Sequence, residues 1–250
     1  MNFIIMRRYF LREVVMKRIF LLFCLFIFCV ACGKSGRTAP SVYKAREKLE
    51  LLGYEFNEES FVKAIEDKRS DIVKLFIDSG MSPNTTYKVG KYKVPVIFYA
   101  INSGDEMTFQ VLLHSKADLL ASVDGVSVLA KAAEKGTPEM ISLIVKSGAD
   151  IDTEGYNKMT PLMTAIESEN NGAAWLFMQS GANVNAADIY GVTPLMRALG
   201  KGNIDIVREL IKKGANVNAV TRKGTKTSKF IGENEREAMT VLLRDAGAEF

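Results

Sequence analysis

Proton-transfer catalysis would have to rely on one histidine and scattered carboxylates. His114 is the only histidine among the 250 residues. It stands in one column of an internal repeat, described below, whose other members are Asp78, Lys146, Gln179, Lys212 and Asp245. Such a column predicts a solvent-facing residue near a helix C-terminus, where positive charge is favourable. No carboxylate pair stands out from the surface acids, so we expect no catalytic residue, no metal site, no cofactor and no enzyme activity.

Gly33-Lys34-Ser35 is similar to the end of a phosphate-binding P-loop, but the rest of that motif is missing. Phe28 stands where the motif has its first glycine, and no strand is predicted before it. The tripeptide therefore does not predict a nucleotide site.

The N-terminal segment has the features of a secretory signal. Lys17-Arg18 precedes thirteen apolar residues, 19–31. This run is too short to span a membrane, which takes about 18 to 20 residues, and basic residues before a short apolar run are typical of a signal peptide. We predict that 1–31 is a signal peptide, with Met16 as an alternative start and an uncleaved anchor as the alternative interpretation.

Cysteine chemistry is concentrated at the end of this segment. The residues F-C-V-A-C at 28–32, followed by G-K-S-G, resemble a bacterial lipoprotein signal, although Cys29 replaces the usual Leu. The resemblance implies that Cys32 is diacylated, carries an amide-linked acyl chain such as palmitate and becomes the mature N-terminus. Several acyl chains at about 0.8 kcal/mol per buried methylene hold a protein stably on a bilayer. Gly33 after the cysteine favours the outer membrane, facing the periplasm of the bacterial cell envelope.

Export also changes the charge of the chain. The whole sequence has 33 Lys and Arg against 29 Asp and Glu, but 1–31 holds five of the basic residues and only one acid. The remainder is balanced, with 28 of each sign. A neutral mature chain lacks the basic footprint of a nucleic-acid binder, so we expect no nucleic-acid partner and membrane contact only through the lipid.

A period of about 33 residues organises the rest of the chain. Helix-starting positions recur at Glu59, Pro95, Ser127, Thr160 and Thr193. A glycine column and an alanine column follow the same steps: Gly80, Lys116, Gly148, Gly181, Gly214 and Gly247, then Ala64, Ala100, Ala132, Ala165 and Ala198. Each unit predicts two short helices and a turn, with Thr193-Pro194 starting the first helix and Gly214 ending the second.

The segments T-P-L-M-R-A, G-N, I-V, L-I and G-A-N-V-N-A of the fifth unit resemble the ankyrin repeat, whose period is 33 residues. The resemblance covers roughly 59–250 and is strongest over 155–220. It implies an all-α ankyrin-repeat solenoid of about six helix-turn-helix repeats with β-turn or hairpin tips, capped at both ends. We predict a tether over 32–40, an N-terminal capping helix within 41–58 with Val42, Ala45, Leu49 and Leu52 on one face, and a sixth repeat that caps the stack with polar residues 226–229.

In ankyrin-like stacks the tips and first helices line a concave groove that binds another protein. Carried over by column, the tip residues are Lys91, Tyr92, Val123, Asp124, Tyr156, Asn157, Ile189, Tyr190, Arg222 and Lys223. The first-helix ends add Asn102, Ser103, Glu134, Lys135, Glu167, Ser168 and Lys201. Three tips carry tyrosine, a residue enriched in interface hot spots; the alternative is that each tyrosine packs on the neighbouring tip.

Three local departures carry further expectations. The stretch 81–94 is three residues longer than its counterparts and predicts an extended, basic finger. Lys116 and Glu169 replace glycine and predict altered geometry in repeats two and four. Trp175 is expected on the outer side of a second helix, either covering the gap left by Ala173 and Ala174 or forming a second contact surface.

These observations together predict an exported, lipid-anchored, monomeric protein that binds another protein through its concave groove. A scaffold or protective accessory role is the first interpretation. An immunity-type inhibitor of an envelope-acting toxin or hydrolase is the alternative.

Overall fold

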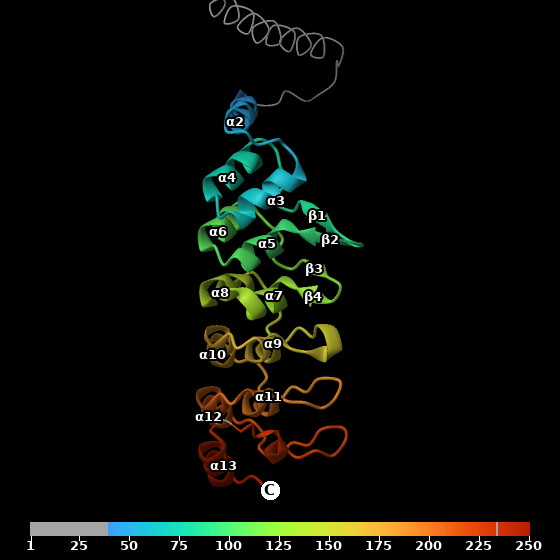
Figure 1. Ribbon diagram of the computed structural model, residues 1–250, viewed down its shortest axis with the longest axis vertical. Helices are drawn as coiled ribbons and strands as arrows, with labels where there is room; N and C mark the ends of the chain where they lie inside the picture. The colour runs from blue at the N-terminus through green and yellow to red at the C-terminus, as the bar shows by residue number, and fades with distance from the viewer. Residues whose placement is uncertain (1–39, 234) are drawn as a thin grey trace, which may run out of the picture. The chain divides into compact units, whose positions relative to one another are not determined.

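The computed structural model describes residues 40–233 and 235–250. The predicted signal peptide, Cys32 and Gly33-Lys34-Ser35 lie outside the described residues. Within the described part, helices pair and stack along the long axis of the molecule (Figure 1).

Five repeats consist of two α-helices each, and the sixth begins with a 3-10 helix. The first helices of the repeats form one column and the second helices form another (Figure 1). The pairs in chain order are α3 (Glu58–Glu66) and α4 (Ser70–Asp78), α5 (Val96–Ser103) and α6 (Glu106–His114), α7 (Val128–Lys135) and α8 (Pro138–Lys146), α9 (Pro161–Glu167) and α10 (Asn171–Gln179), α11 (Pro194–Lys201) and α12 (Ile204–Lys212), and η2 (Thr227–Phe230) and α13 (Arg236–Asp245).

Four of the five predicted helix-starting positions, Pro95, Ser127, Thr160 and Thr193, are N-caps, and the alanine column is confirmed. The expectation for Glu59 is wrong, because α3 begins at Glu58 and is capped by Asn57. Thr193 begins α11 by accepting a hydrogen bond from the Met196 amide at 3.3 Å, and Pro194 occupies the first turn, where no amide donor is needed. All five column alanines are fully buried. Their small side chains let consecutive first helices pack closely.

The N-terminal helix α2 (Pro40–Leu51) covers the first repeat. Ala45 and Leu49 are buried, and the Arg46 guanidinium bonds the Ser79 carbonyl at 2.9 Å. The expectation for Leu52 is wrong: the helix ends at Leu51, so Leu52 leaves the predicted face and is 49% exposed.

The predicted finger is a β-hairpin. Strand β1 (Thr86–Val89) pairs antiparallel with β2 (Tyr92–Pro95), so that Lys88 lies opposite Lys93 and Val89 opposite Tyr92. The next tip is a shorter hairpin of β3 (Ser122–Val123) and β4 (Val126–Ser127). The fourth repeat has a 3-10 turn, η1 (Tyr156–Lys158), in this place.

Two expectations about local geometry need correction. Lys116 and Glu169 keep the left-handed backbone of the glycines they replace, with φ of 68° and 57°. The departure falls instead in the third repeat, where Gly136 has φ of −78° and a Cβ there would lie 2.8 Å from the Ala132 carbonyl oxygen. Glycine at 136 is thus required by close approach rather than by a positive φ.

The sixth repeat also differs from the expectation of a polar outer face. Thr227 is fully buried and Ser228 nearly so. The Thr227 hydroxyl donates to the Ala219 carbonyl at 2.9 Å, and the Ser228 hydroxyl donates to the Glu249 carbonyl at 3.3 Å. Because both hydroxyls find carbonyl partners, they are buried without an unsatisfied donor.

Side chains four residues after the glycine column connect successive repeats. The side-chain Nδ2 of Asn185 donates to the Gly214 carbonyl at 3.0 Å, and its Oδ1 accepts from the backbone N–H of Asn216 at 2.7 Å. Asn84 and Asn218 make the same two bonds, and Asp152 makes the accepting one. In the second repeat this position holds Leu120, which is 60% exposed and supplies neither bond.

We expect Leu120→Asn to stabilise the stack. The new side-chain amide can reach the backbone carbonyl of Gly148 and the backbone N–H of Asp150. Two hydrogen bonds on an exposed edge contribute about 1 kcal/mol in total. Urea unfolding measures the change, with Asn185→Leu as the matched control that should lower stability by about 1–2 kcal/mol. A lowered midpoint for Leu120→Asn would show that the loop before repeat three cannot adopt the ladder geometry.

Candidate partner-binding surface

The predicted tip residues lie in one row along the side of the stack that carries the turns (Figure 1). Six of the ten are exposed: Lys91, Asp124, Tyr156, Tyr190, Arg222 and Lys223. The other four are half-buried: Tyr92, Val123, Asn157 and Ile189. The structure therefore brings the predicted residues to one surface, but as a row of separate tips rather than one cluster.

Backbone hydrogen bonds connect the last three tips. The Ile189 amide donates to the Asn157 carbonyl at 3.0 Å, and the Arg222 amide donates to the Tyr190 carbonyl at 2.9 Å. Gly191 makes the second contact possible, because a Cβ at this position would lie 2.8 Å from the Arg222 amide nitrogen, and its φ is +80°. These tips are held in place before any partner binds.

The three tip tyrosines are not equivalent. Tyr156 is 74% exposed and Tyr190 is 58% exposed. Tyr92 is half-buried, and the Lys91 ammonium lies 4.9 Å from its ring centroid. The two fully presented tyrosines stand on successive tips, where their rings offer apolar area with a polar hydroxyl.

A hollow of about 500 Å³ lies beside Tyr190. Its apolar lining comes from Val192, Met196 and Phe230, and Arg197 and Lys201 contribute their charged side chains. Because the lining is apolar with charged groups among it, the hollow suits an apolar side chain of a partner.

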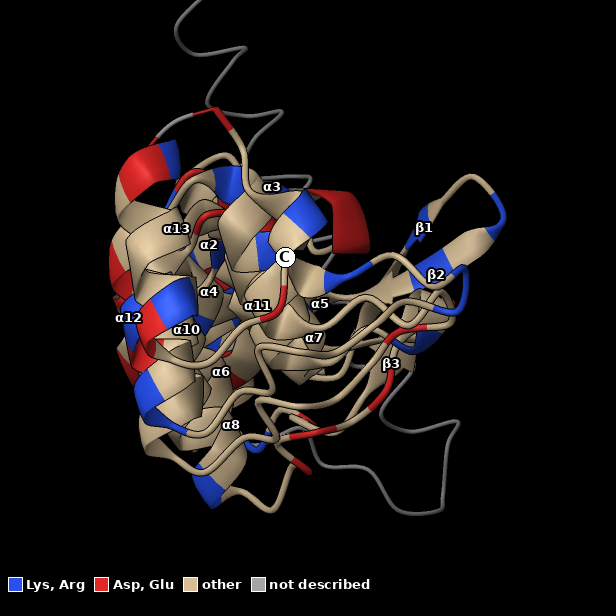
Figure 2. Cartoon of the chain, turned by 90° about the horizontal axis from the view of Figure 1, so that it is seen from below, with Lys and Arg blue, Asp and Glu red and all other residues tan. Residues whose placement is uncertain are grey.

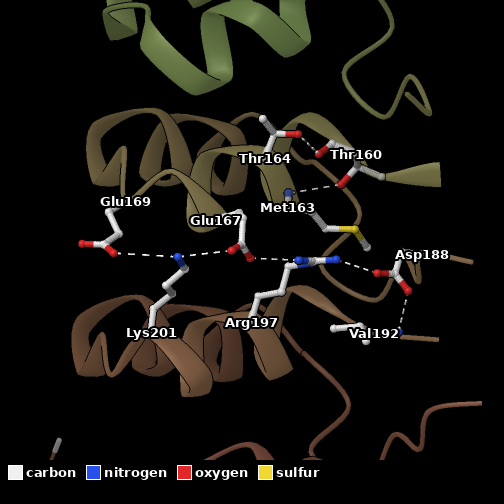
Figure 3. A network of polar contacts seen from close by, with 9 residues as sticks. All are labelled: Thr160, Met163, Thr164, Glu167, Glu169, Asp188, Val192, Arg197 and Lys201. Carbon is white, nitrogen blue, oxygen red and sulfur yellow. Dashed lines mark hydrogen bonds and ion pairs between the residues drawn. The ribbon is translucent and has the colours of Figure 1, made fainter. Parts of the chain in front are cut away.

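A chain of ion pairs (Figure 3) includes four of the residues that line this hollow, Glu167, Asp188, Arg197 and Lys201. The Arg197 guanidinium bonds the Glu167 carboxylate at 2.9 Å and the Asp188 carboxylate at 2.5 Å. Lys201 Nζ lies 3.2 Å from Glu167 and 3.8 Å from Glu169. The network joins the first helices of repeats four and five to the tip that presents Tyr190.

Asp188 is the buried member of the network. Its side chain is 1% exposed, and its Oδ1 accepts from the amides of Tyr190 and Val192 at 2.8 and 2.9 Å. The Arg197 guanidinium neutralises the negative charge of this buried carboxylate. Burial by itself would raise the pKa of the half-exposed Glu167, but the hydrogen bonds from Lys201 and Arg197 outweigh it and lower that pKa below the usual 4.5.

The sequence did not point to Arg197, Asp188 or Phe230 as members of a site. One signal was present: Arg197 is the only arginine in its repeat column, which elsewhere holds Lys63, Tyr99, Lys131, Thr164 and Phe230. Phe230 stands in the same column, 33 residues after Arg197, so the period indicates that the two residues occupy equivalent positions in successive repeats.

Other candidate positions lie away from this surface. His114 is exposed, and its Nδ1 lies 2.7 Å from the Gln110 carbonyl. Trp175 is on the second helix α10 as predicted and is 38% exposed, while its neighbours in sequence, Ala173 and Ala174, are fully buried. Within 40–233 and 235–250, no cluster of His, Cys, Asp and Glu suits a metal ion. No helix in the same residues is long and apolar enough to cross a bilayer.

The fold and the row of tips define a class of binding protein, the helical repeat solenoids, and comparison gives the family. The model for ankyrin repeats matches residues 97–188 and 129–221, which together span half of the chain. The chain belongs to the ankyrin-repeat family, whose members are typically non-enzymatic binding scaffolds.

One related protein and one solved structure are similar to the chain. An ankyrin repeat-containing protein of Treponema pallidum (strain Nichols) is 34% identical over 124 residues, which are 49% of this chain and 41% of that protein. The match thus spans less than half of the relative's length. The crystal structure of the human ASB11 ankyrin repeat domain superposes with a TM-score of 0.68 at 20% identity, covering 82% of this chain and 97% of that one; at this identity the likeness concerns the fold alone.

We expect Arg197→Leu to destabilise the stack by about 2–4 kcal/mol, because it leaves the Asp188 carboxylate buried without a cation. Chemical unfolding measures the loss. Glu167→Gln is the control, since it removes only a half-exposed partner and should cost less than about 1 kcal/mol. Asp188→Asn in the Arg197→Leu background should recover part of the loss, and no recovery would contradict the assigned role of the charge.

Proposed function

We propose that this protein is exported, anchored to the cell envelope by lipid at Cys32, and binds another protein through the tip surface beside the Tyr190 hollow. Its role is that of a scaffold or protective accessory protein. The observation that carries the proposal is the combination of two exposed tyrosines on adjoining tips with a preformed, partly apolar hollow.

Rigidity supports a binding role for this surface. The hydrogen bonds between tips and the Arg197 network fix the geometry around Tyr190 in the free chain. A surface that is already ordered loses little conformational entropy on association, so more of the contact energy becomes affinity. Tyrosine adds to this because it has few rotamers to lose.

Anchoring is supported by the sequence. The segment that ends at Cys32 combines basic residues, a short apolar run and this cysteine in the pattern of a lipoprotein signal. Helix α2 already begins at Pro40, so the tether is shorter than predicted, and the seven residues 33–39 reach at most about 23 to 25 Å when extended. An anchored chain would therefore keep its N-terminal end close to the membrane and meet partners at the cell envelope.

The joint variant Tyr92→Ala, Tyr156→Ala, Tyr190→Ala should lose the partner without unfolding, because it removes large exposed area and leaves the core intact. Cross-linking in the native envelope, followed by identification of the captured protein, measures the loss. The matched control changes exposed residues away from the tips: Tyr43→Ala, Met107→Ala and Val241→Ala. Undiminished capture by the tip variant at an unchanged melting temperature would overturn the tip surface as the binding site.

Cys32→Ser should abolish acylation, because serine lacks the thiol to which the diacylglyceryl group is attached. Incorporation of labelled palmitate and fractionation of membranes measure the effect. A chain that begins at Met16 is the control and should still be labelled if 16–31 suffices as the signal. Label retained by Cys32→Ser would contradict the assigned position.

A further inference from the structure

The β1–β2 hairpin concentrates positive charge that the described residues do not neutralise. Lys88, Lys91 and Lys93 are all exposed. None of the three has a carboxylate oxygen within 4.0 Å among the described residues, although ion pairs are common elsewhere on the stack. Figure 2 shows this hairpin projecting past the other tips with basic segments on both strands.

The pairing register of the hairpin places two of these positive charges next to each other. Lys88 lies directly opposite Lys93, so their Cβ atoms are about 4.5–5.5 Å apart on one face of the hairpin. Like charges in opposite positions destabilise a two-stranded ribbon. An anionic group placed between them would convert this repulsion into two ion pairs.

The opposite face of the hairpin explains how the lysines are held. Tyr87 and Val94 form the next cross-strand pair, and Tyr87 packs against Tyr99 of α5 at 6.3 Å between ring centroids. This contact attaches the base of the hairpin to the first helix of its repeat. The lysine face is thereby kept pointing outward.

We propose that the hairpin binds an acidic segment of the partner protein, with Asp or Glu carboxylates seated between Lys88 and Lys93. This inference rests on the proposed function, since it names the chemistry of the partner. Lys91 contributes at the turn, where its ammonium already lies over the Tyr92 ring. Lys88 and Lys93 hold the carboxylates, and Lys91 adds positive charge at the turn.

Two other occupants fit the observations less well. Membrane binding by an interfacial segment scales with the apolar area that it buries, and Val89 is the only large apolar side chain of the hairpin with substantial exposure, at 49%. The chain's own N-terminal residues are also unsuitable, because 1–39 is basic: it holds Arg7, Arg8, Arg12, Lys17, Arg18, Lys34 and Arg37 against Glu13.

The test compares the full chain with Lys88→Gln/Lys93→Gln, using a labelled oligo-glutamate peptide as the probe and oligo-glutamine as its neutral match. We expect the variant to bind oligo-glutamate about tenfold more weakly, because it loses the affinity that two exposed ion pairs contribute together. The control Lys146→Gln/Lys229→Gln removes two exposed lysines from other surfaces and should change binding less than about twofold. The melting temperature of the hairpin variant should stay equal or rise, because a like-charge pair is removed.

Several results would overturn the inference. The first is no binding of oligo-glutamate by the unaltered chain, and the second is an equal loss of affinity in the hairpin variant and the control variant. The third is an unchanged affinity of the hairpin variant together with new self-association, which would mean that the lysines prevent the strand edge from pairing with another chain. Binding to phosphatidylcholine vesicles that contain phosphatidylglycerol separates the lipid alternative: a loss there on Lys88→Gln/Lys93→Gln, without one for the peptide, overturns an acidic protein segment. Both chains carry the same anchor, so its contribution cancels.

The outcome is distinguishable from failure of the proposed function. If the tyrosine variant loses the partner while Lys88→Gln/Lys93→Gln retains it, the tip surface stands and the acidic segment is wrong. If neither variant changes capture, both proposals fail.

Discussion

Close stacking of the first helices through a column of alanines is the constraint on which the structure depends. Each of the five alanines is fully buried. A larger side chain in this column would force neighbouring repeats apart and cost the packing of a whole interface. Since a single pair of short helices cannot bury its own apolar face, repeat geometry and stability are properties of the contact between units. The position of every tip follows from this contact.

Hydrogen bonds and ion pairs between repeats make the stack more rigid, but they do not determine whether it forms. The asparagine ladder and the Arg197 network both join neighbouring units, but each occurs only where particular side chains are present. Leu120 breaks the ladder between repeats two and three, and the stack continues through that point because the apolar contacts do not depend on the ladder. The polar groups therefore set how rigidly two units are joined, while burial sets whether they are joined.

The same division explains what the sequence could predict. The period, the alanine column and the Thr-Pro starts predict the helices because they reflect constraints that recur in each unit. Lys116 and Glu169 show the limit of such column arguments: a residue other than glycine can adopt φ near +60° when the surrounding turns hold it there, so the substitution does not reveal a change in geometry. Thr227 and Ser228 show another limit, since their burial depends on carbonyls of Ala219 and Glu249 whose positions are set only in the folded cap.

The candidate binding surface was predictable as a location but not as a set of converging residues. The repeat columns identify the tips, and they also place Arg197 and Phe230 at the same position of successive repeats. They do not show that these residues and Tyr190 enclose a hollow, because that depends on how the side chains pack in the folded stack. The charges along the row are also particular to each tip. Lys91 is unpaired among the described residues, Asp124 is negative, and Lys158 is paired with Glu154 at 3.4 Å. Arg222 and Lys223 add exposed positive charge at the last tip. A partner that contacts the whole row would therefore need an order of charges that matches the tips, and not only a complementary overall sign.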